Sequence, residues 1–576
     1  PRLHARGVVV ANADWAQDKH FLEIDEMGAR LDPWPLLHGK IAISRLDVQG
    51  AAVNLEAAPD GRRNWVLSPT SGGGHGLPPS LTDLSTLRIS DGRILYRDGT
   101  QQANAWQVTK VKIDCAPGLR KLSLGMVLEN NGHPLEVNGS FEDLSQIGIA
   151  GAHTQGTLTF HSGDAGARLE GVLPLSAATR DFDVRFAIDA RSLKEAFGFF
   201  HVDHGLPAAL KASARVQGTA ESIAVSDAQL QLGSMHASGE GMWRRDSKPV
   251  FDVQLRADHV DMDRTFVDAG MPPLPPKPEG ELFHDHPLPW AMLVALDGMQ
   301  GRAQVRIDAL DLRSGVTVKD AAADLRFNDD RMTAQHFSGK LLGGSTEGEA
   351  LFEGRHQAVQ LHLQLHGTQL GTWFKDSGKK LNISGGPMEV DARLSTRGTS
   401  MKDLAAGISG PMNIRIGPAK ILSEKAGRAE FWMNGLFSAR DADSVDLTCA
   451  SLRLPFKSGV ARGDGIAGAR SEASQILGSG TVDMRKEEVD LHGRLRARSG
   501  VNLGISTFAG DIKLVGKIAK PQLNLDEAGV GSVIARIGAA ILTSGASIVA
   551  TAIWDGANPA SDPCQLVFSG PPAKRK

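Results

Sequence analysis

The stretch ARLDPWPLLHGKIAISRLDVQGAAVNLEAAPDGRRNW, residues 29–65, decides the fold class of this chain. After a loop on Pro33-Trp34-Pro35, apolar residues recur at β spacing over residues 41–48 and again through Val53 and Leu55. The turn sequence Pro59-Asp60-Gly61 follows. The stretch therefore predicts two short strands that each present one apolar face, closed by Asn64-Trp65.

Alternating runs of the same kind recur along the chain, at residues 182–188, 251–255, 305–307 and 359–365. Successive side chains of a strand point to opposite faces, so each run makes one apolar and one polar face. We therefore predict an all-β dominated fold, an elongated and curled antiparallel sheet with a few short helices and a C-terminal apolar helical segment.

A long antiparallel sheet must hide its apolar face, and a curled sheet without a second layer would form an apolar groove. Twelve residues of the alternating runs are the candidates for lining this groove. They are Phe182, Val184, Phe186, Ile188, Phe251, Val253, Leu255, Val305, Ile307, Leu361, Leu363 and Leu365. Ordinary core packing is an equal alternative for each of them.

Composition excludes several classes of protein. The 576 residues are 41% hydrophobic and 22% charged, with a formal net charge of -3, close to a soluble globular average. Neither a disordered chain nor a polytopic membrane protein fits these values. A nucleic-acid partner is not expected, because such proteins normally carry a basic face.

Catalytic motifs are missing from the sequence, so we expect no enzyme activity, no cofactor and no metal. There is no G-x-S-x-G, P-loop or H-E-x-x-H pattern. The glycines of a G-x-G-x-x-G string, Gly463, Gly465 and Gly468, are followed by more alternating sequence, which favours a glycine-rich β-turn. His284 and His286 lack further ligands nearby in sequence.

Proline-rich and glycine-rich segments divide the chain into expected parts. The run 271–289 contains many prolines and cannot form a central strand, and a glycine-rich loop begins at residue 71. The expected parts are an N-terminal β unit (1–70), a β-rich middle of the groove (71–270), a Pro-rich linker (271–289), a C-terminal β-groove (290–527) and an apolar helical end with a tail (528–576).

Helices are expected at four places. Three are short or interior candidates, at residues 192–200, 401–408 after Ser400, and 421–437. The fourth is the apolar segment 530–554, for which a hairpin or amphipathic helix packed on the end of the sheet is favoured over insertion into a membrane surface.

The N-terminal stretch resembles a recurring segment of the AsmA family of Gram-negative envelope proteins. The matching residues are Leu36, Leu37, Gly39, Ile41, Ile43, Leu46, Val53, Leu55, Asp60, Gly61, Asn64 and Trp65. Residues 394–416 and 446–489 resemble strand units of the same family. The resemblance implies that residues 1–70 and 290–527 are AsmA-like β units.

The resemblance also implies a function. AsmA-like proteins look like lipid carriers that are anchored in the inner membrane and project a β-rich groove into the periplasm. We therefore expect a periplasmic protein of envelope biogenesis that moves phospholipid between the inner and outer membranes. Its expected partners are phospholipid, the inner membrane through an N-terminal anchor upstream of Pro1, and outer-membrane components.

Two other function classes and one pairing stay open. The chain could be an assembly factor that binds client strands of outer-membrane proteins at a sheet edge, or an enzyme acting on envelope glycans, which would need a pair of acidic residues in a cleft. If the envelope assignment holds, Cys449 and Cys564 could form a disulfide; three reduced thiols, including Cys115, are the alternative.

Overall fold

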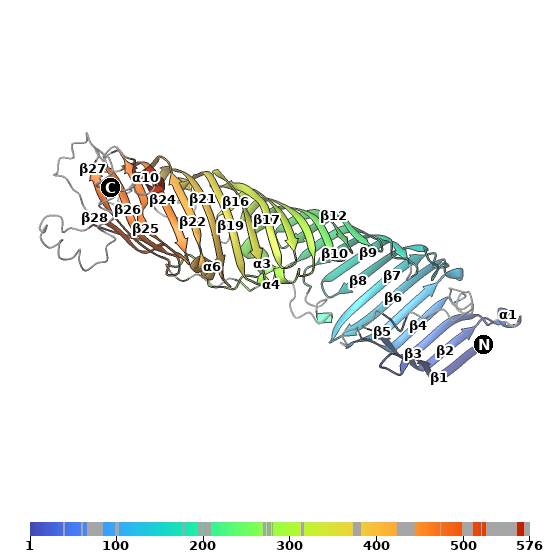
Figure 1. Cartoon of the computed structure of the whole chain (residues 1–576). Helices are drawn as coiled ribbons and strands as arrows, with labels where there is room; N and C mark the ends of the chain where they lie inside the picture. The colour runs from blue at the N-terminus through green and yellow to red at the C-terminus, as the bar shows by residue number, and fades with distance from the viewer. Residues whose placement is uncertain are drawn as a thin grey trace. The chain divides into compact units, whose positions relative to one another are not determined.

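The computed structural model consists mostly of β-strands (Figure 1). The chain divides into two compact units, one formed by Pro1–Ser247, Val253–Leu255 and Arg264–Pro272 and the other by Lys248–Asp252, Arg256–Asp263 and Pro273–Lys576. The structure describes residues 1–38, 41–58, 62–65, 84–97, 103–176, 179–193, 198–199, 209–268, 272–273, 278, 280–312, 316–372, 382–422, 444–472, 474–497, 511–519, 521–525 and 562–569.

Unit 1 is an up-and-down sheet in which each strand pairs with the next one along the chain. All these pairs are antiparallel except β3–β4, which is parallel. Its strands are β1 (Arg2–Ala11), β2 (His20–Leu31), β3 (Ile43–Glu56), β4 (Thr86–Arg97), β5 (Ala103–Cys115), β6 (Lys121–Asn130), β7 (His133–Glu142), β8 (His153–Ser162), β9 (Ala165–Pro174), β10 (Phe182–Ala190), β11 (Leu210–Gly218), β12 (Ser222–Leu232) and β13 (Met235–Arg244).

Unit 2 repeats the up-and-down order, with β20 and β23 paired beside the main series and β23 also joined to β24. β14 (Val250–Asp261) contributes residues to both units. The other strands are β15 (Gln300–Asp311), β16 (Thr317–Asn328), β17 (Arg331–Leu341), β18 (Gly344–Glu353), β19 (Ala358–Gln369), β20 (Asn382–Gly385), β21 (Pro387–Arg397), β22 (Gly410–Ile416), β23 (Ala419–Leu422), β24 (Ser444–Lys457), β25 (Val460–Ser471), β26 (Ser474–Asp483), β27 (Glu488–Ala497), β28 (Asp511–Lys517) and β29 (Gln522–Leu525).

The described helices are all short. They are α1 (Pro33–Leu36), the 3-10 turn η2 (Pro117–Leu119), α3 (Met262–Asp268), α4 (Trp290–Val294), α6 (Met401–Gly407) and α10 (Pro563–Ser569). The helix expected after Ser400 is confirmed as α6, where the Ser400 hydroxyl accepts the Asp403 N–H at 3.1 Å.

The other helix predictions have mixed outcomes. Of the expected helix at 421–437, residues 421–422 end β23 instead, and the rest lies outside the described residues. The apolar segment 530–554 and most of 192–200 also lie outside them.

The fold class is therefore confirmed as a mostly β chain with open, curled antiparallel sheet and few short helices (Figure 1). The five-part division of the chain stays a prediction.

The two strands expected from residues 41–55 are one strand, β3, so that prediction was wrong in detail. Gly50 has a φ of 67° in the middle of β3, and the apolar phase changes there from even to odd residues. A Cβ at Gly50 would lie 2.0 Å from Asp25 Oδ2, so only glycine fits. In the sequence, this change of phase looks like the end of one strand and the start of another. The expected loop at residues 33–35 also differs, since it forms the single turn α1.

The same kink occurs in the strands beside β3. Gly7 in β1 and Asp91 in β4 have φ values of 64° and 55°, and the strand pairing skips both residues as it skips Gly50. Because the kinks coincide, the register is kept while the apolar side chains stay on one face of the sheet. Such irregularities bend strands and help an open sheet to curl.

Candidate functional site

The predicted groove residues of β10 share one face of the sheet. Phe182, Val184, Phe186 and Ile188 alternate along the strand. Their partners on β11 are all small or apolar, and Val184 pairs with Val216. The alternation predicted from the sequence therefore makes an apolar face in the folded unit.

This apolar face continues across unit 1 from β1 to β11. If partners are followed from strand to strand, each position on the path through Phe186 is an apolar residue or a glycine. The path runs through Leu3, Ala29, Leu46, Leu87, Ile113, Leu124, Gly139, Leu158, Leu169, Phe186 and Ala214. We call this the unit 1 apolar path.

An equivalent path crosses unit 2. Val305 and Leu363 lie on one line of paired residues, and Leu361 and Leu365 flank Leu363 on the same face of β19. A neighbouring line of paired residues starts at Leu365 and reaches β28. The unit 2 apolar path runs through Leu365, Val390, Ile414, Leu452, Ala467, Gly478, Gly493 and Ile512.

The remaining predicted residues lie on β14 and β15. Phe251, Val253 and Leu255 alternate along β14, and the Phe251 ring packs against Phe327 of β16 with 5.3 Å between ring centroids. Ile307 is two residues beyond Val305 on β15 and therefore shares its face. The twelve predicted residues thus lie on apolar strand faces, and their contact with a ligand stays a prediction.

Exposure shows that the apolar faces are not covered as a protein core would be. Of the twelve predicted residues, Val184 is buried at 5% exposure and Leu255 is 46% exposed, while the other ten are half-buried. The inner faces of a two-layer sandwich interdigitate and bury their side chains. A single curled sheet has no second sheet packed over its apolar face, so the side chains of that face are only half-buried.

Aromatic rings cover glycines on these faces. A Cβ at Gly218 would lie 2.0 Å from the Phe182 ring, and one at Gly301 would lie 2.5 Å from the Phe251 ring. Gly348 of β18 likewise leaves room for the ring of Phe337, the residue that it pairs with on β17. Each ring therefore occupies the space beside the glycine backbone that a larger side chain would fill.

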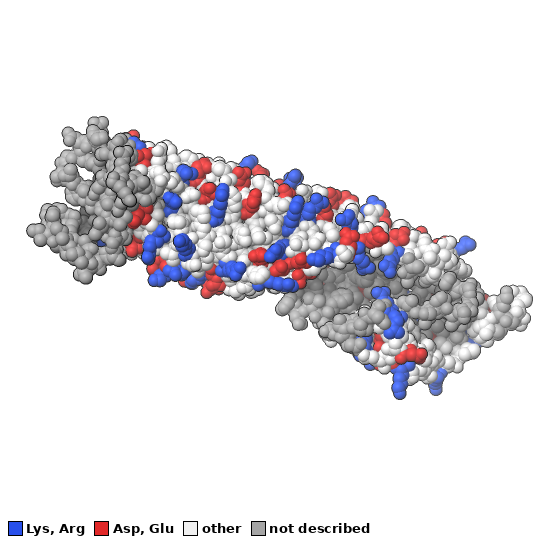
Figure 2. Space-filling view, viewed as in Figure 1, with Lys and Arg blue, Asp and Glu red and all other residues white. Residues whose placement is uncertain are grey.

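The opposite faces carry ion pairs between neighbouring strands. Arg215 Nε donates to Asp183 Oδ1 at 2.8 Å, and hydrogen bonds from Arg215 and Gln217 lower the pKa of Asp183 to about 2. In unit 2, a hydrogen bond from His366 contributes to a lowered pKa of Glu389, although burial of this carboxyl acts in the opposite direction. Figure 2 shows such cations and carboxylates interspersed on the face in view. The sheet therefore has one polar and one apolar side.

A concavity of about 280 Å³ lies on the apolar side of unit 2. It is centred on the far end of the unit 2 apolar path, between β22 and β28. Its apolar lining includes Ile414, Ile416, Leu452, Ile476, Leu491, Ile512 and Leu514.

Helix α10 packs on the other side of the same strands. Val567 of α10 contacts Leu477, and a Cβ at Gly468 would meet Pro563 and Val567. A disulfide joins Cys449 of β24 to Cys564 of α10, with 6.4 Å between the Cα atoms. The helix is therefore fixed to the polar side and leaves the apolar concavity open.

The disulfide decides between the two cysteine alternatives, since only Cys115 is a free thiol. Burial raises the pKa of the Cys115 thiol. Among the described residues, the single cluster of metal-type side chains is Cys449, Asp562 and Cys564, and its two sulfurs are bonded to each other.

Two motifs considered in the sequence have structural roles. Gly463, Gly465 and Gly468 lie within strand β25, not in a turn as expected, and the strand β26 follows them. Asp285, between the two histidines, accepts a hydrogen bond from Ser400 Oγ at 3.0 Å, which ties this segment to the start of α6.

Sequence reasoning missed most members of the two apolar paths. Leu46 and Leu87 lie in strands with clear alternation, which the sequence could have revealed. Gly139, Ala467 and Gly478 could not be recognised, because a small residue carries no apolar signal of its own. Their place on the face follows only from the pairing of their strands.

Comparison with known proteins gives one match. The model of the AsmA family matches residues 1–71 and 245–464, about half of the chain. No curated protein and no solved structure gave a significant match. Within the described residues, no helix combines the length and apolar character needed to cross a bilayer.

Proposed function

This chain belongs to the AsmA family, and from that premise we propose that it is an envelope biogenesis protein that shields lipid acyl chains on its apolar sheet faces and moves phospholipid between the inner and outer membranes. The observation that carries the proposal is the continuity of the apolar paths, which run from β1 to β11 in unit 1 and from β19 to β28 in unit 2.

An acyl chain on such a path stays out of water from strand to strand. Shielding one methylene from water is worth roughly 0.8 kcal/mol, so a chain of many methylenes is held strongly overall. Neighbouring positions on the path are chemically alike, so a shift by one strand changes the free energy little. Movement along the face then needs no bond making or breaking, and the proposed role is not enzymatic.

The proposed location is the periplasm, with the full-length protein anchored to the inner membrane. The disulfide between Cys449 and Cys564 supports an oxidising compartment, because such bonds are rare where thiols are kept reduced. The polar sides with their ion pairs suit exposure to water.

Native mass spectrometry tests the proposal most directly. The chain is purified gently from a Gram-negative host, its mass is measured without denaturation, and its lipids are extracted and identified. We expect several phospholipids on each chain. A well-folded chain without lipid would contradict the carrier function.

A second function is favoured by one observation, the edge of unit 1. Among the described residues β1 pairs only with β2, and it exposes Val9 by 51% and Val10 by 43%. A client strand could add to such an edge through main-chain hydrogen bonds. The chain would then be an assembly factor for outer-membrane proteins, and co-purification of a β-barrel protein in place of lipid would favour this function.

A further inference from the structure

The loop between β2 and β3 exposes three large apolar side chains to water. Trp34 is 72% exposed, Leu37 77% and Ile41 62%, and all three lie within one short connection. Single exposed apolar residues are common, but a cluster of this kind marks an interaction site. Figure 1 shows α1, which contains Trp34, projecting beyond the sheet close to the N-terminus.

This tip is ordered by its own hydrogen bonds. Asp32 Oδ1 accepts the Trp34 N–H at 3.1 Å and the Asp32 N–H donates to the Ala42 carbonyl at 2.9 Å, which closes the loop at its base. The Leu37 N–H donates to the Pro33 carbonyl at 3.2 Å. Trp34 and Leu37 are therefore presented by a formed turn, and Ile41 lies next to the closing hydrogen bond at Ala42, so little conformational entropy remains to be lost there on binding.

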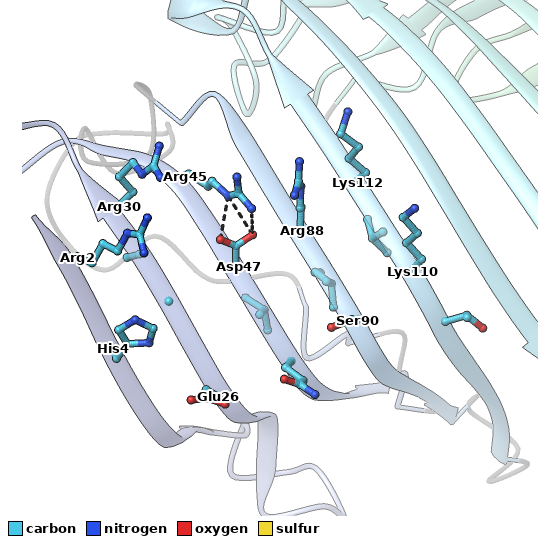
Figure 3. Close-up of a pocket in the computed structure, with 17 residues that line it drawn as sticks. Arg2, His4, Glu26, Arg30, Arg45, Asp47, Arg88, Ser90, Lys110 and Lys112 are labelled. Atoms are coloured by element: carbon cyan, nitrogen blue, oxygen red, sulfur yellow. Dashed lines mark hydrogen bonds and ion pairs between the residues drawn. The ribbon is translucent and has the colours of Figure 1, made fainter.

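A basic surface lies beside the tip on the polar side of β1 to β5. Arg2, Arg30 and Arg45 are paired neighbours on β1, β2 and β3, one step from the loop, and Arg88 and Lys112 are paired one step further (Figure 3). These side chains line a shallow concavity of about 900 Å³. Tip and basic surface thus meet at the same end of the strands.

The basic surface carries an excess of positive charge. With Lys110, six cations line the concavity against two carboxylates, Glu26 and Asp47. Asp47 pairs with Arg45 at 2.8 Å and Glu26 with Arg6 at 3.1 Å. Within the described part of the chain, no carboxylate lies within ion-pair distance of Arg2, Arg30, Arg88 or Lys110.

We propose that the tip and the basic surface together form a contact site for an anionic lipid bilayer. Trp34, Leu37 and Ile41 enter the interfacial region of the bilayer, where tryptophan side chains are enriched, and the arginines approach the anionic headgroups. The excess of positive charge requires a negatively charged partner. The apolar tip requires a partner with an apolar interior, which a bilayer has and a soluble polyanion lacks.

This proposal does not depend on lipid carriage along the apolar paths, because it uses the other side of the sheet. Flotation with vesicles tests it. The full chain is mixed with vesicles of phosphatidylcholine alone or of phosphatidylcholine with phosphatidylglycerol, and the bound fraction is measured at low and high salt. We expect binding to the anionic vesicles that weakens as salt rises.

Two sets of variants separate the parts of the site. Trp34→Ser with Leu37→Ser should weaken binding by at least about tenfold. Arg2→Gln, Arg30→Gln and Arg88→Gln should each weaken binding by about fivefold. The matched control is Val9→Ser with Val10→Ser, an exposed apolar pair near the opposite end of β1, which should bind as the unaltered chain does.

Quenching of tryptophan fluorescence by brominated lipids gives an independent readout. Quenching should fall in Trp34→Phe, since the proposal places Trp34 in the bilayer. Equal binding to neutral and anionic vesicles, unchanged binding of the tip variants, or no vesicle binding by the folded chain would each overturn the proposal.

Discussion

At the scale of single residues, Asn64 holds the N-terminal strands together. Its side chain is 7% exposed, and its Oδ1 accepts the Glu56 N–H at 2.8 Å. Its Nδ2 donates to the Asn54 carbonyl at 2.7 Å and to Asn12 Oδ1 at 3.0 Å. The motif that marks the family in this sequence is therefore a structural clamp on β3.

Replacing Asn64 should destabilise unit 1. Asn64→Ala leaves the Glu56 N–H and the Asn54 carbonyl buried without partners, so we expect a loss of about 2–4 kcal/mol in the free energy of unfolding. Urea unfolding followed by tryptophan fluorescence measures it. Asn138→Ala, at an exposed position of β7, is the control and should change little. Equal stability of both variants would refute the clamp.

At the scale of elements, the sequence predicted strand type well and strand boundaries less well. The alternation at residues 182–188 and 359–365 matches β10 and β19 closely. The prediction failed at residues 41–55, because a single residue with positive φ, Gly50, changes the apolar phase without ending the strand. The alternation of apolar and polar residues is interrupted at such a kink, so the sequence alone cannot show that the strand continues.

Helix α10 shows a different limit of sequence reasoning. Its seven residues give little signal of their own, and their position depends on the Cys449–Cys564 bond across 115 residues of chain. Sequence left that pair as one of two alternatives, since spacing along the chain does not report distance in space. The packing of α10 on the polar side follows from Gly468 and Leu477, small and apolar positions on an otherwise polar face.

Counting thiols tests the pairing. The chain unfolded without reductant should show one reactive thiol, that of Cys115, and three after reduction. Cys449→Ser with Cys564→Ser should lower the free energy of unfolding by about 2–4 kcal/mol, because the link no longer restricts the unfolded chain. Cys115→Ser serves as the control and should leave the pair intact. Three reactive thiols before reduction would show the link to be absent.

At the scale of the whole molecule, the proposed function depends on apolar faces that continue from each strand to its neighbour. The sequence predicted which residues of a strand face the apolar side, but it could not predict which residues of other strands continue that face. Val305 and Leu363 lie far apart in sequence and on one line of paired residues in unit 2. The strand pairing shows which residues continue the face, and it alone places small residues such as Gly139 and Ala467 on the apolar paths.

A charge placed on each apolar face should interrupt lipid movement. Val184→Asp with Leu363→Asp puts a carboxylate on the apolar side of each unit, where an acyl chain cannot solvate it. We expect the folded variant to lose most of its bound phospholipid and its transfer of lipid between donor and acceptor vesicles. Ala187→Asp with Gln360→Asp adds the same charge to the polar side as a control. If both double variants carried lipid equally well, the apolar faces would not be the route.

The up-and-down order of the strands has a consequence for how the chain folds. Apart from the crossover at β3–β4 and the β20–β23 pair, almost every strand finds its partner in the segment made just before it. Such local pairing keeps loop-closure entropy small and lets structure grow from one end, as in repeat proteins. Each unit is therefore suited to folding progressively while the chain emerges, with every completed hairpin serving as the template for the next.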